Sequence, residues 1–514
     1  MGLSEQEELR HVARRELLGR GIDPYPADSF PLTGLSSDLS RRFEEDPSSC
    51  ANVSLAGRIR SRRIMGAASF VELQDSGGRI QLYLKRDDIC SGSDKSFYNE
   101  IFKRYMDIGD LIGVQGSMFR TQRGEITLRV RSLKLLCKSL RPLPVVKESS
   151  SDGDGDGSKI YDAFSDPEQR YRQRYVDLIL NSQVREIFVQ RTKLVQVIRN
   201  FLNGRKYLEV ETPILQALWG GATARPFITH HHVLKTDLYL RIANELYLKR
   251  LIVGGFDGVY EFSKDFRNEG MSRFHNPEFT QMELYVAYKD YYWMAELTEN
   301  LIGEVLRVLH GSTRIQVGDR EIDFSSPWRR VHFYDLLEEK TGESLRGSGN
   351  KDLERLAKKW DLSVPSHASK AKLLDMLFSH LCEPNLIEPT FVLNHPVELS
   401  PLAKKHREEE GVVERFELIC NGKEICNAYS ELNDPVEQRI RFQQQLDLAK
   451  KGDVEAMAMD EDFLRALSYG MPPTSGLGIG IDRLAMLMTN SSSIQDVLFF
   501  PQMRPESSGK PKNI

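Results

Sequence analysis

The chain has 514 residues, 40% of them hydrophobic and 28% charged, and a formal net charge of −4. This length exceeds what one core organises, so we expect roughly two to four domains. The near-neutral balance excludes a globally basic nucleic-acid-binding protein, and any contact with nucleic acid has to come from a local patch.

The cysteines and the N-terminus bear on the cellular compartment. Six cysteines contain no C-x-x-C pair, so we expect reduced thiols, no disulfide framework and no zinc site. The N-terminal segment 1–21 is charged throughout and lacks the apolar stretch of a signal peptide. No apolar run approaches the roughly 18 residues of a membrane helix. These features predict a cytoplasmic protein without a membrane partner.

The first part of the chain predicts a helical extension over residues 1–51, with a mixed-charge helix at 4–20. Short strands dominate residues 52–146. Five strands, with a helix over 97–106 between the third and the fourth, predict a small closed barrel of the OB type. The basic residues of its first strand and turn are Arg58, Arg60, Arg62 and Arg63.

Two interpretations of this barrel fit its sequence equally well. In the first, the barrel is structural and its basic rim is simply solvated. In the second, the barrel is a platform for single-stranded nucleic acid, on which Phe70 stacks against a base and Gln81 reads one base edge.

Residues 147–160 are rich in Gly, Ser and Asp and predict a flexible linker. Their spaced aspartates match the opening of a calcium loop, but Ala163 stands at the twelfth position, where a bidentate Glu is required. We therefore expect a second large domain over residues 161–506, followed by a C-terminal tail at 507–514.

The second domain begins with a strong helical pattern. Apolar residues recur at helical spacing over 183–203, which predicts an amphipathic helix. Strands are predicted at 207–213, where a proline stops the pattern, and at 239–242. A second helix is predicted at 292–309, and residues 310–400 mix helices and loops without recognisable chemistry.

Residues 278–288 alternate strictly between two kinds of side chain, which predicts a strand. One face is apolar and suits a core. The other carries an aromatic ring, an amide, a carboxylate and a phenol, which suit either a solvated face or the wall of a binding site. The polar face holds Phe279, Gln281, Glu283 and Tyr285, and the apolar face holds Met282, Leu284 and Val286.

An Asn-Gly pair at 421–422 predicts a tight hairpin. The hairpin brings Glu417 and Glu424 close together on a common face. Strict alternation places the later polar side chains on the opposite face, so a bulge near 425–426 is required if all of them serve one site. These later side chains are Asn427, Tyr429 and Glu431.

The sequence GLGIG at 476–480 precedes a predicted helix at 481–488, with Arg483 in its first turn. Glycines of this kind are a weak signal on their own, because close backbone packing also requires them.

Together these pieces suit a site for ATP and a small cation. Glu417 and Glu424 suit Mg²⁺, which takes one or two carboxylates plus phosphate oxygens. Arg267 and Arg483 suit phosphate groups, and Phe279 offers a ring for adenine. The chain has no G-x-x-x-x-G-K-[ST] loop, which excludes a P-loop nucleotide site. The alternative is a set of structural ion pairs, and the convergence of these residues on separate strands favours the site.

Over nearly its whole length the chain resembles class II aminoacyl-tRNA synthetases, specifically lysyl-tRNA synthetases of the bacterial type. Motif 1 of the family corresponds to about 184–213, motif 2 to about 259–288 with FRNEG and HNPEF, and motif 3 to about 476–488 with GLGIGIDR. Other matching stretches are GGATARPFITHH, LRIANELYLKRL, ERFEL and NAYSELND. The resemblance implies an α+β fold: an N-terminal OB-type anticodon-binding barrel joined to a class II catalytic domain built on an antiparallel sheet flanked by helices.

The resemblance also implies a role for each matching position. The catalytic residues are Arg267 and Arg483. The ATP-binding residues are Arg267, Glu269, His275, Asn276, Phe279, Glu417 and Arg483. The lysine-binding residues are Gly221, Glu245, Arg267, Glu283, Tyr285, Asn427, Tyr429 and Glu431. The metal ligands are Glu417 and Glu424, and the anticodon-binding residues are Phe70, Gln81 and Glu125.

The implied reaction is ATP-dependent attachment of L-lysine to tRNA(Lys) through lysyl-adenylate, with release of AMP and pyrophosphate. It uses Mg²⁺ and no zinc, in a homodimer formed through the motif 1 helix and strand. A pocket with Glu283, Glu431 and Tyr285 suits an ammonium group and repels an acidic side chain. Three departures are Asn244, where the family usually has Pro, Tyr429, where it usually has Phe, and Phe274, where bacterial relatives often carry Arg.

Two rival functions predict different features in the sequence. A paralogue that transfers lysine to a protein resembles the catalytic domain alone, so the barrel argues against it. A nucleic-acid-binding or regulatory protein on an inactive synthetase fold predicts loss of Arg267, Arg483 or the two acids of the hairpin, and all of these are present.

Overall fold

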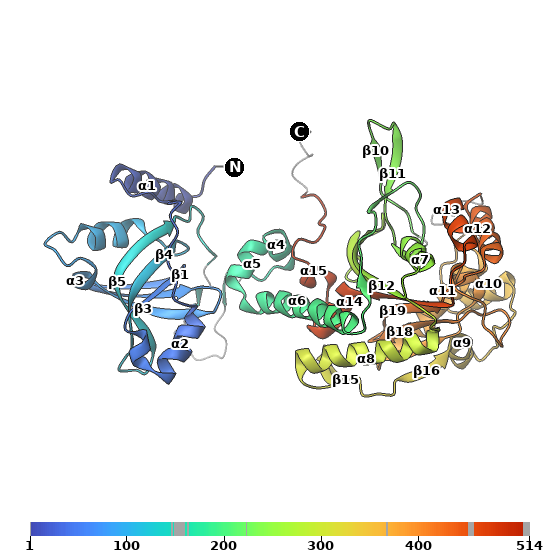
Figure 1. The fold of residues 1–514 in the computed structure, drawn as a ribbon. Coiled ribbons are helices and arrows are strands. Elements are labelled where there is room, and N and C mark those ends of the chain that lie inside the picture. Colours follow the sequence, from blue (N-terminus) through green and yellow to red (C-terminus); the bar gives the residue numbers. More distant parts are fainter. Residues whose placement is uncertain are drawn as a thin grey trace. The chain divides into compact units, whose positions relative to one another are not determined.

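The computed structural model describes residues 2–144, 147–148, 160–161, 164–222, 224–365, 368–450 and 457–506. The chain forms two compact units, Met1–Ser165 and Asp166–Ile514 (Figure 1). Most of the predicted linker at 147–160 and the predicted tail at 507–514 lie outside the described residues. At the two ends of the linker, β6 (Lys147–Glu148) pairs with β7 (Ile160–Tyr161).

The first unit contains the predicted barrel, closed in the order β1-β2-β3-β5-β4. Burial alternates along β2 and β3, so that one set of side chains fills the interior while the other faces outward. The predicted N-terminal helix is confirmed as α1. The strands are β1 (Val53–Met65), β2 (Ala68–Gln74), β3 (Arg79–Lys85), β4 (Leu111–Arg120) and β5 (Ile126–Cys137). The helices are α1 (Glu5–Gly19), α2 (Ser36–Glu45), η1 (Pro47–Cys50), α3 (Arg86–Ile89) and η2 (Phe97–Tyr105).

The second unit is built on an eight-stranded sheet in the order β16-β17-β18-β19-β20-β13-β12-β8. Neighbouring strands are antiparallel except at the two edges, where β16 runs parallel to β17 and β8 parallel to β12. The sheet strands are β8 (Leu208–Glu209), β12 (Gly258–Phe266), β13 (Glu278–Ala287), β16 (Arg329–His332), β17 (Thr390–Leu393), β18 (Arg415–Cys420), β19 (Lys423–Ser430) and β20 (Thr474–Gly480). The predicted antiparallel sheet flanked by helices is therefore confirmed.

Helices α6 (Ser182–Asn203), α8 (Tyr291–His310) and α14 (Ile481–Met488) pack with the apolar face of β13 in the main core, and Figure 1 shows α6 and α8 along the sheet. Met282, Leu284 and Val286 lie in this core, as their alternation predicts. Helix α7 (Glu245–Val253) packs on β12 and β13 with α12 (Pro435–Lys450) and α13 (Glu461–Ser468) in a separate cluster.

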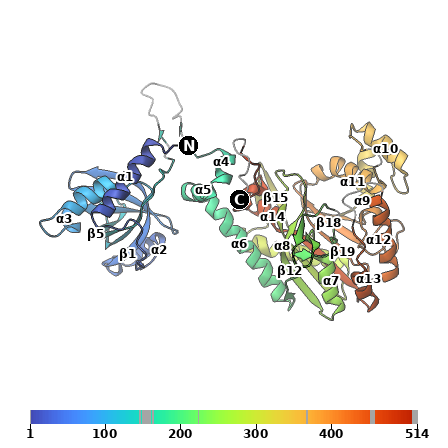
Figure 2. The same cartoon turned by 90° about the horizontal axis from the view of Figure 1, so that it is seen from above.

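A third group of helices covers residues 333–381: α9 (Phe333–Thr341), α10 (Asn350–Lys359) and α11 (Lys370–Leu381) cluster together (Figure 2). The remaining helices are α4 (Pro167–Arg172), α5 (Arg174–Leu180), α15 (Ile494–Val497), η3 (Glu383–Asn385) and η4 (Val397–Leu399). The remaining strands are β9 (Leu215–Gln216), β10 (Ile228–His231), β11 (Thr236–Leu240), β14 (Arg314–Val317) and β15 (Arg320–Asp323).

Two predicted strands differ from the observed ones. The strand predicted at 207–213 is reduced to β8, because the chain pairs with the sheet edge over only Leu208 and Glu209 before it leaves. The strand predicted at 239–242 is β11, which starts earlier and ends at Leu240. The next side chain, Arg241, turns inward to pair with Glu261 and Asp265 and so belongs to a buried ionic network.

Candidate active site

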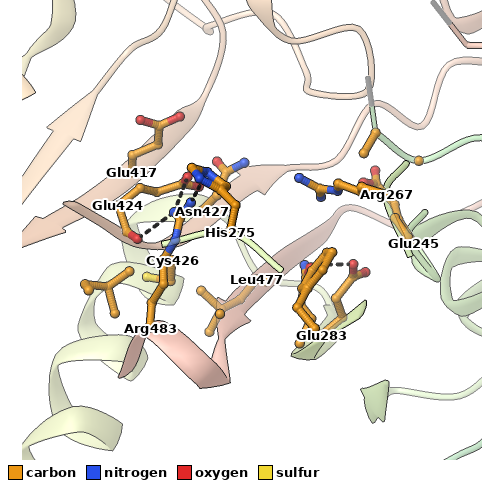
Figure 3. A pocket seen from close by; sticks show the side chains of 18 of the residues that line it. Glu245, Arg267, His275, Glu283, Glu417, Glu424, Cys426, Asn427, Leu477 and Arg483 are labelled. Atoms are coloured by element: carbon orange, nitrogen blue, oxygen red, sulfur yellow. Dashed lines mark hydrogen bonds and ion pairs between the residues drawn. The ribbon is translucent and has the colours of Figure 1, made fainter. Parts of the chain in front are cut away.

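A cavity of about 640 Å³ lies over the central strands of the second unit. It brings together every residue predicted for the catalytic, ATP and metal sites, and every predicted lysine-binding residue except Glu431. Figure 3 shows the arrangement: Glu245 lies at one end of the group, Glu417 and Glu424 lie at the other, and the Arg267 side chain extends from the Glu245 end towards the centre.

Strand β13 supplies one wall of the cavity. Its polar face, predicted from strict alternation, lines the cavity with Phe279, Gln281, Glu283 and Tyr285. A period of two residues thus lets one strand present a ring, an amide, a carboxylate and a phenol in a single row.

The hairpin β18–β19 lies on the other side of β20 from β13 in the same sheet and also lines the cavity, and its predicted bulge is confirmed. Leu418 pairs with Cys426, but the next residue, Ile419, pairs with Glu424, so Ile425 is the extra residue. The bulge reverses the alternation along β19, and both parts of the strand therefore reach the same cavity. The predicted side chains that line it are Glu417, Glu424, Asn427 and Tyr429.

Arg483 is held at one end of the cavity by the hairpin and by the loop after β12. Its Nη1 donates to the main-chain oxygen of Glu424 at 3.0 Å and lies 3.3 Å from Oε2 of the same residue. Its Nη2 lies 3.1 Å from Nε2 of His275. Burial, together with the neighbouring Arg483 cation, lowers the pKa of His275, so this ring is neutral at physiological pH.

Arg267 lies in the middle of the cavity. Its guanidinium sits 5.0 Å from the ring centre of Phe279. Its Nε is buried and has no hydrogen-bond partner within the part of the chain that the structure describes. Because an unpartnered buried donor is unfavourable, this position is suited to an anionic ligand.

The acidic pair of the hairpin lies next to Arg483. Glu417 accepts a 2.6 Å bond from Nη2 of Arg415. Burial raises the pKa of Glu417 to about 7, although Arg415 opposes this; Glu424 and Asp375 raise it further. Carboxylates that repel one another in this way favour a bound cation.

These carboxylates fit Mg²⁺ in the presence of a phosphate ligand. Among the described residues no group of three or more His, Cys, Asp or Glu side chains forms a ligand set complete in itself. Glu417 and Glu424 offer the one or two carboxylates that Mg²⁺ commonly takes from a protein, and phosphate oxygens and water supply the rest of its octahedral shell.

The other end of the cavity is deeply buried. Glu283 is 3% exposed, and it accepts hydrogen bonds from Tyr285 Oη at 2.9 Å and Gln281 Nε2 at 3.0 Å. Burial, reinforced by the charges of Glu245 and Asp265, raises the pKa of Glu283 well above its usual range. Burial thus favours the neutral form of Glu283, and a cationic group in the cavity would favour its ionised form.

Two glycines leave room around these side chains. Gly221 has a φ of 86°, and a Cβ there would lie 3.0 Å from that of Ala243. A Cβ on Gly476 would lie 2.1 Å from Oε1 of Glu431 and 2.5 Å from the Tyr285 ring. The GLGIG glycines lie within the central strand β20, which pairs with β13 and β19, and do not form a loop. Glycine is required at Gly476 and Gly478 because side chains from the neighbouring strands lie close above them.

Glu431 is the one predicted lysine-binding residue that does not line the cavity. It is 1% exposed and forms an ion pair with Lys249, whose Nζ also lies 2.5 Å from Oε1 of Glu245. Glu431 is therefore placed to affect the cavity through Lys249.

Sequence reasoning missed several cavity residues. Arg415 bonds Glu417 and donates to Oδ1 of Asn427 at 3.0 Å. Its spacing of two residues from Glu417 was an available signal, because both lie on one face of β18. Lys372 and Asp375 also line the cavity, but they come from α11, and the helical pattern there gives no sign of this role.

Besides Tyr429, two further departures from the family pattern have clear positions. Phe274 lines the cavity, with the Lys423 ammonium 5.0 Å from its ring centre. Asn244 is fully buried and precedes α7, and its Nδ2 donates to Oε2 of Glu261 at 2.9 Å. Asn244 thus joins the buried network around Arg241 in a way that proline cannot.

In the barrel, Phe70 and Gln81 lie on the outward face of β2 and β3. The Phe70 ring lies 5.2 Å from that of Tyr83, and Oε1 of Gln81 accepts a 3.2 Å bond from Thr127 Oγ1. Glu125 is exposed and precedes β5. The aromatic pair offers a surface on which a base can stack.

Comparisons with known proteins agree with this architecture. The family model of class II tRNA synthetases (D, K and N) matches residues 166–504, and that of the OB-fold nucleic-acid-binding domain matches residues 53–136. The chain therefore belongs to the class II tRNA synthetases.

Several relatives named lysine--tRNA ligase match almost the full chain. The protein of Christiangramia forsetii is 56% identical over 98% of this chain and 87% of its own length. That of Porphyromonas gingivalis is 55% identical over 98% and 86%, and that of Azobacteroides pseudotrichonymphae 54% identical over 98% and 99%. Within the described part of the chain, every helix is too short or too polar to cross a membrane.

Proposed function

We propose that this chain activates L-lysine with ATP and transfers the lysyl group to tRNA(Lys). The observation that carries this proposal is one cavity with a buried acidic end, a central arginine with an unpartnered nitrogen and a phosphate-binding end. The relatives named lysine--tRNA ligase, which match this chain over 98% of its length, support the choice of lysine.

Lysine enters with its ammonium groups toward the buried carboxylates. Glu283 and Tyr285 receive the side-chain ammonium, and Glu245 with the backbone at Gly221 receives the α-ammonium. Asn427 and Tyr429, whose side chains hydrogen-bond to each other at 3.0 Å, complete the wall. Glu431 acts on this group of residues from outside the cavity lining.

ATP lies along the rest of the cavity. Phe279 stacks on the adenine, while Glu269, His275 and Asn276 contact the nucleotide. Arg483 holds the γ-phosphate, since its guanidinium is fixed by Glu424 and His275 at the cavity end.

The lysine carboxylate then attacks the α-phosphorus in line, which releases pyrophosphate and leaves lysyl-adenylate. Arg267 contacts both the carboxylate and the α-phosphate and so lowers the barrier by positioning and by neutralising charge that grows in the transition state. The terminal ribose hydroxyl of the tRNA attacks the acyl carbon next, and AMP leaves. Glu417 and Glu424 would hold Mg²⁺, which would neutralise phosphate charge.

The barrel, at 52–146, binds the anticodon of the tRNA. The proposed contacts are stacking on Phe70 and base-edge hydrogen bonds from Gln81 and Glu125. The catalytic domain, at 161–506, works in the cytoplasm as a homodimer through the motif 1 segment at 184–213. Exposed apolar side chains there, such as Val189 and Leu208, support this assembly.

Exchange of labelled pyrophosphate into ATP tests the activation step across a panel of amino acids. We expect exchange with lysine and little with aspartate or asparagine, whose side chains meet buried carboxylates. Activation of aspartate or asparagine in place of lysine would contradict the substrate assignment. Charging of tRNA(Lys) separates this function from that of a protein-modifying paralogue, which would support exchange without charging tRNA.

A further inference from the structure

Lys249 is a buried cation that the proposed reaction does not use. It lies one turn after Glu245 on α7, its side chain is 0% exposed, and its Nζ forms ion pairs with Glu245 and Glu431. Burial alone would lower the pKa of Lys249, but the two carboxylates outweigh burial and raise it. The ammonium therefore stays charged in the interior.

The surroundings of Lys249 are strongly acidic. Three buried carboxylates, those of Glu245, Glu283 and Glu431, meet at this end of the cavity, and Tyr285 and Tyr429 face them. Glu283 has no ion-pair partner among the described residues, and Lys249 is the partner of the other two. Arg415, whose guanidinium lies 5.7 Å from the Tyr429 ring centre, is paired with Glu417.

The charges at this end can be counted. Burial raises the pKa of Glu431 to about 8 and that of Glu283 well above its usual range, so both ionise fully only when positive charge is added. With all three carboxylates ionised in the lysine-bound state, the one internal ammonium would leave a deficit of two positive charges. Lysine carries two ammonium groups, and Arg267 is available for its carboxylate. The deficit thus equals what a bound lysine supplies, because buried charges are stable only when compensated.

We propose that Lys249 is a positioning residue that sets this charge count and holds Glu245 and Glu431 in place for a substrate with two ammonium groups. This inference rests on the proposed function. It explains how Glu431, which does not line the cavity, takes part in lysine binding: its carboxylate is neutralised by Lys249, and Lys249 in turn fixes Glu245 beside the cavity.

The first test is Lys249→Met, which keeps the length of the side chain and removes its charge. We expect the KM for lysine in pyrophosphate exchange to rise at least about 100-fold, since Glu245 and Glu431 would repel each other and take up a proton. The KM for ATP should stay within about threefold, because the phosphate end is unaffected. Arg250→Met is the matched control: the next residue of α7 pairs with Asp460 and is not part of the cavity lining.

The second test is the double variant Lys249→Met/Glu431→Gln. It removes one positive and one negative charge and so restores the deficit of two. Glu431→Gln alone leaves two carboxylates against the Lys249 ammonium, which is a deficit of only one positive charge. We therefore expect the double variant to have a lower KM for lysine than either single variant. If the two substitutions caused independent structural defects, their effects on KM would instead multiply.

The outcomes are distinct. A Lys249→Met enzyme with the wild-type KM for lysine, or a double variant weaker in lysine binding than Glu431→Gln, would overturn the charge count. If Lys249→Met alone does not fold, the comparison of the double variant with Glu431→Gln still decides. Failure of the wild-type enzyme to exchange pyrophosphate in the presence of lysine would instead refute the proposed function.

Discussion

The two ends of the cavity, proposed to take lysine and the phosphates of ATP, differ in how deeply their charged side chains are buried. At the lysine end Glu283 is 3% exposed and is held by a phenol and an amide. At the phosphate end the Glu424 side chain is 39% exposed, and Arg483 reaches across to it and to His275. A buried carboxylate discriminates sharply, because a ligand that leaves it unpaired loses several kcal/mol. A partly exposed arginine such as Arg483 suits a nucleotide phosphate, whose recognition does not depend on which amino acid is activated.

The largest effect is expected where the two ends meet, at Arg267. Arg267→Ala should lower lysine-dependent exchange by about 10³-fold, because in the proposed reaction the guanidinium contacts both reacting groups. Lys264→Ala, at an exposed position on β12, the strand that ends just before Arg267, is the control. Exchange that persists in Arg267→Ala would show that the ends do not act through this residue.

The lysine end can be tested alone with Glu283→Gln. The substitution keeps the shape and removes the charge that pairs with the substrate ammonium. We expect the KM for lysine to rise about 100-fold with the KM for ATP nearly unchanged. Equal rises in the two KM values would mean that the ends are not separate.

A substitution in the barrel extends the comparison beyond the cavity. Phe70→Ala should lower kcat/KM for tRNA charging roughly tenfold, the usual effect of losing one stacked base. Pyrophosphate exchange should stay at the wild-type level, since it does not involve the anticodon. Leu9→Ala, at an exposed position on α1, serves as the control. A loss of both activities would argue against a base-stacking role.

The smallest effect is a pH dependence of lysine binding. Burial raises the pKa of Glu283, so the free enzyme holds a proton there that a bound ammonium expels. Binding therefore strengthens as pH rises through the raised pKa of Glu283, and over that range the KM for lysine should fall by at most about tenfold per pH unit. Glu283→Gln should abolish this slope, and a slope that survives the substitution would assign the proton to another group.

Much of the site was readable from local sequence. Strict alternation gave both faces of β13, and the side chains of its polar face line the cavity. The bulge at Ile425 followed from chemistry, because Glu424 and Asn427 could serve one site only if the alternation broke between them. In each case the signal lay within a few residues of one strand.

Other parts of the site had no such signal. Lys372 and Asp375 reach the cavity because α11 packs beside it, and a helix in isolation does not show what it packs against. The hairpin turn, by contrast, had a local signal: Asn421 and Gly422 predicted it, and both have the positive φ that such a turn requires.

The sequence by itself determined the barrel, the antiparallel sheet and the row of cavity side chains on β13, since these depend on periods of two residues and on turn chemistry. Only the tertiary structure placed Lys249 between Glu245 and Glu431. A lysine within a helix is usually a surface residue, and only the packing of α7 on β12 and β13, with Glu431 beside it, shows that this charge is buried and opposed by two carboxylates.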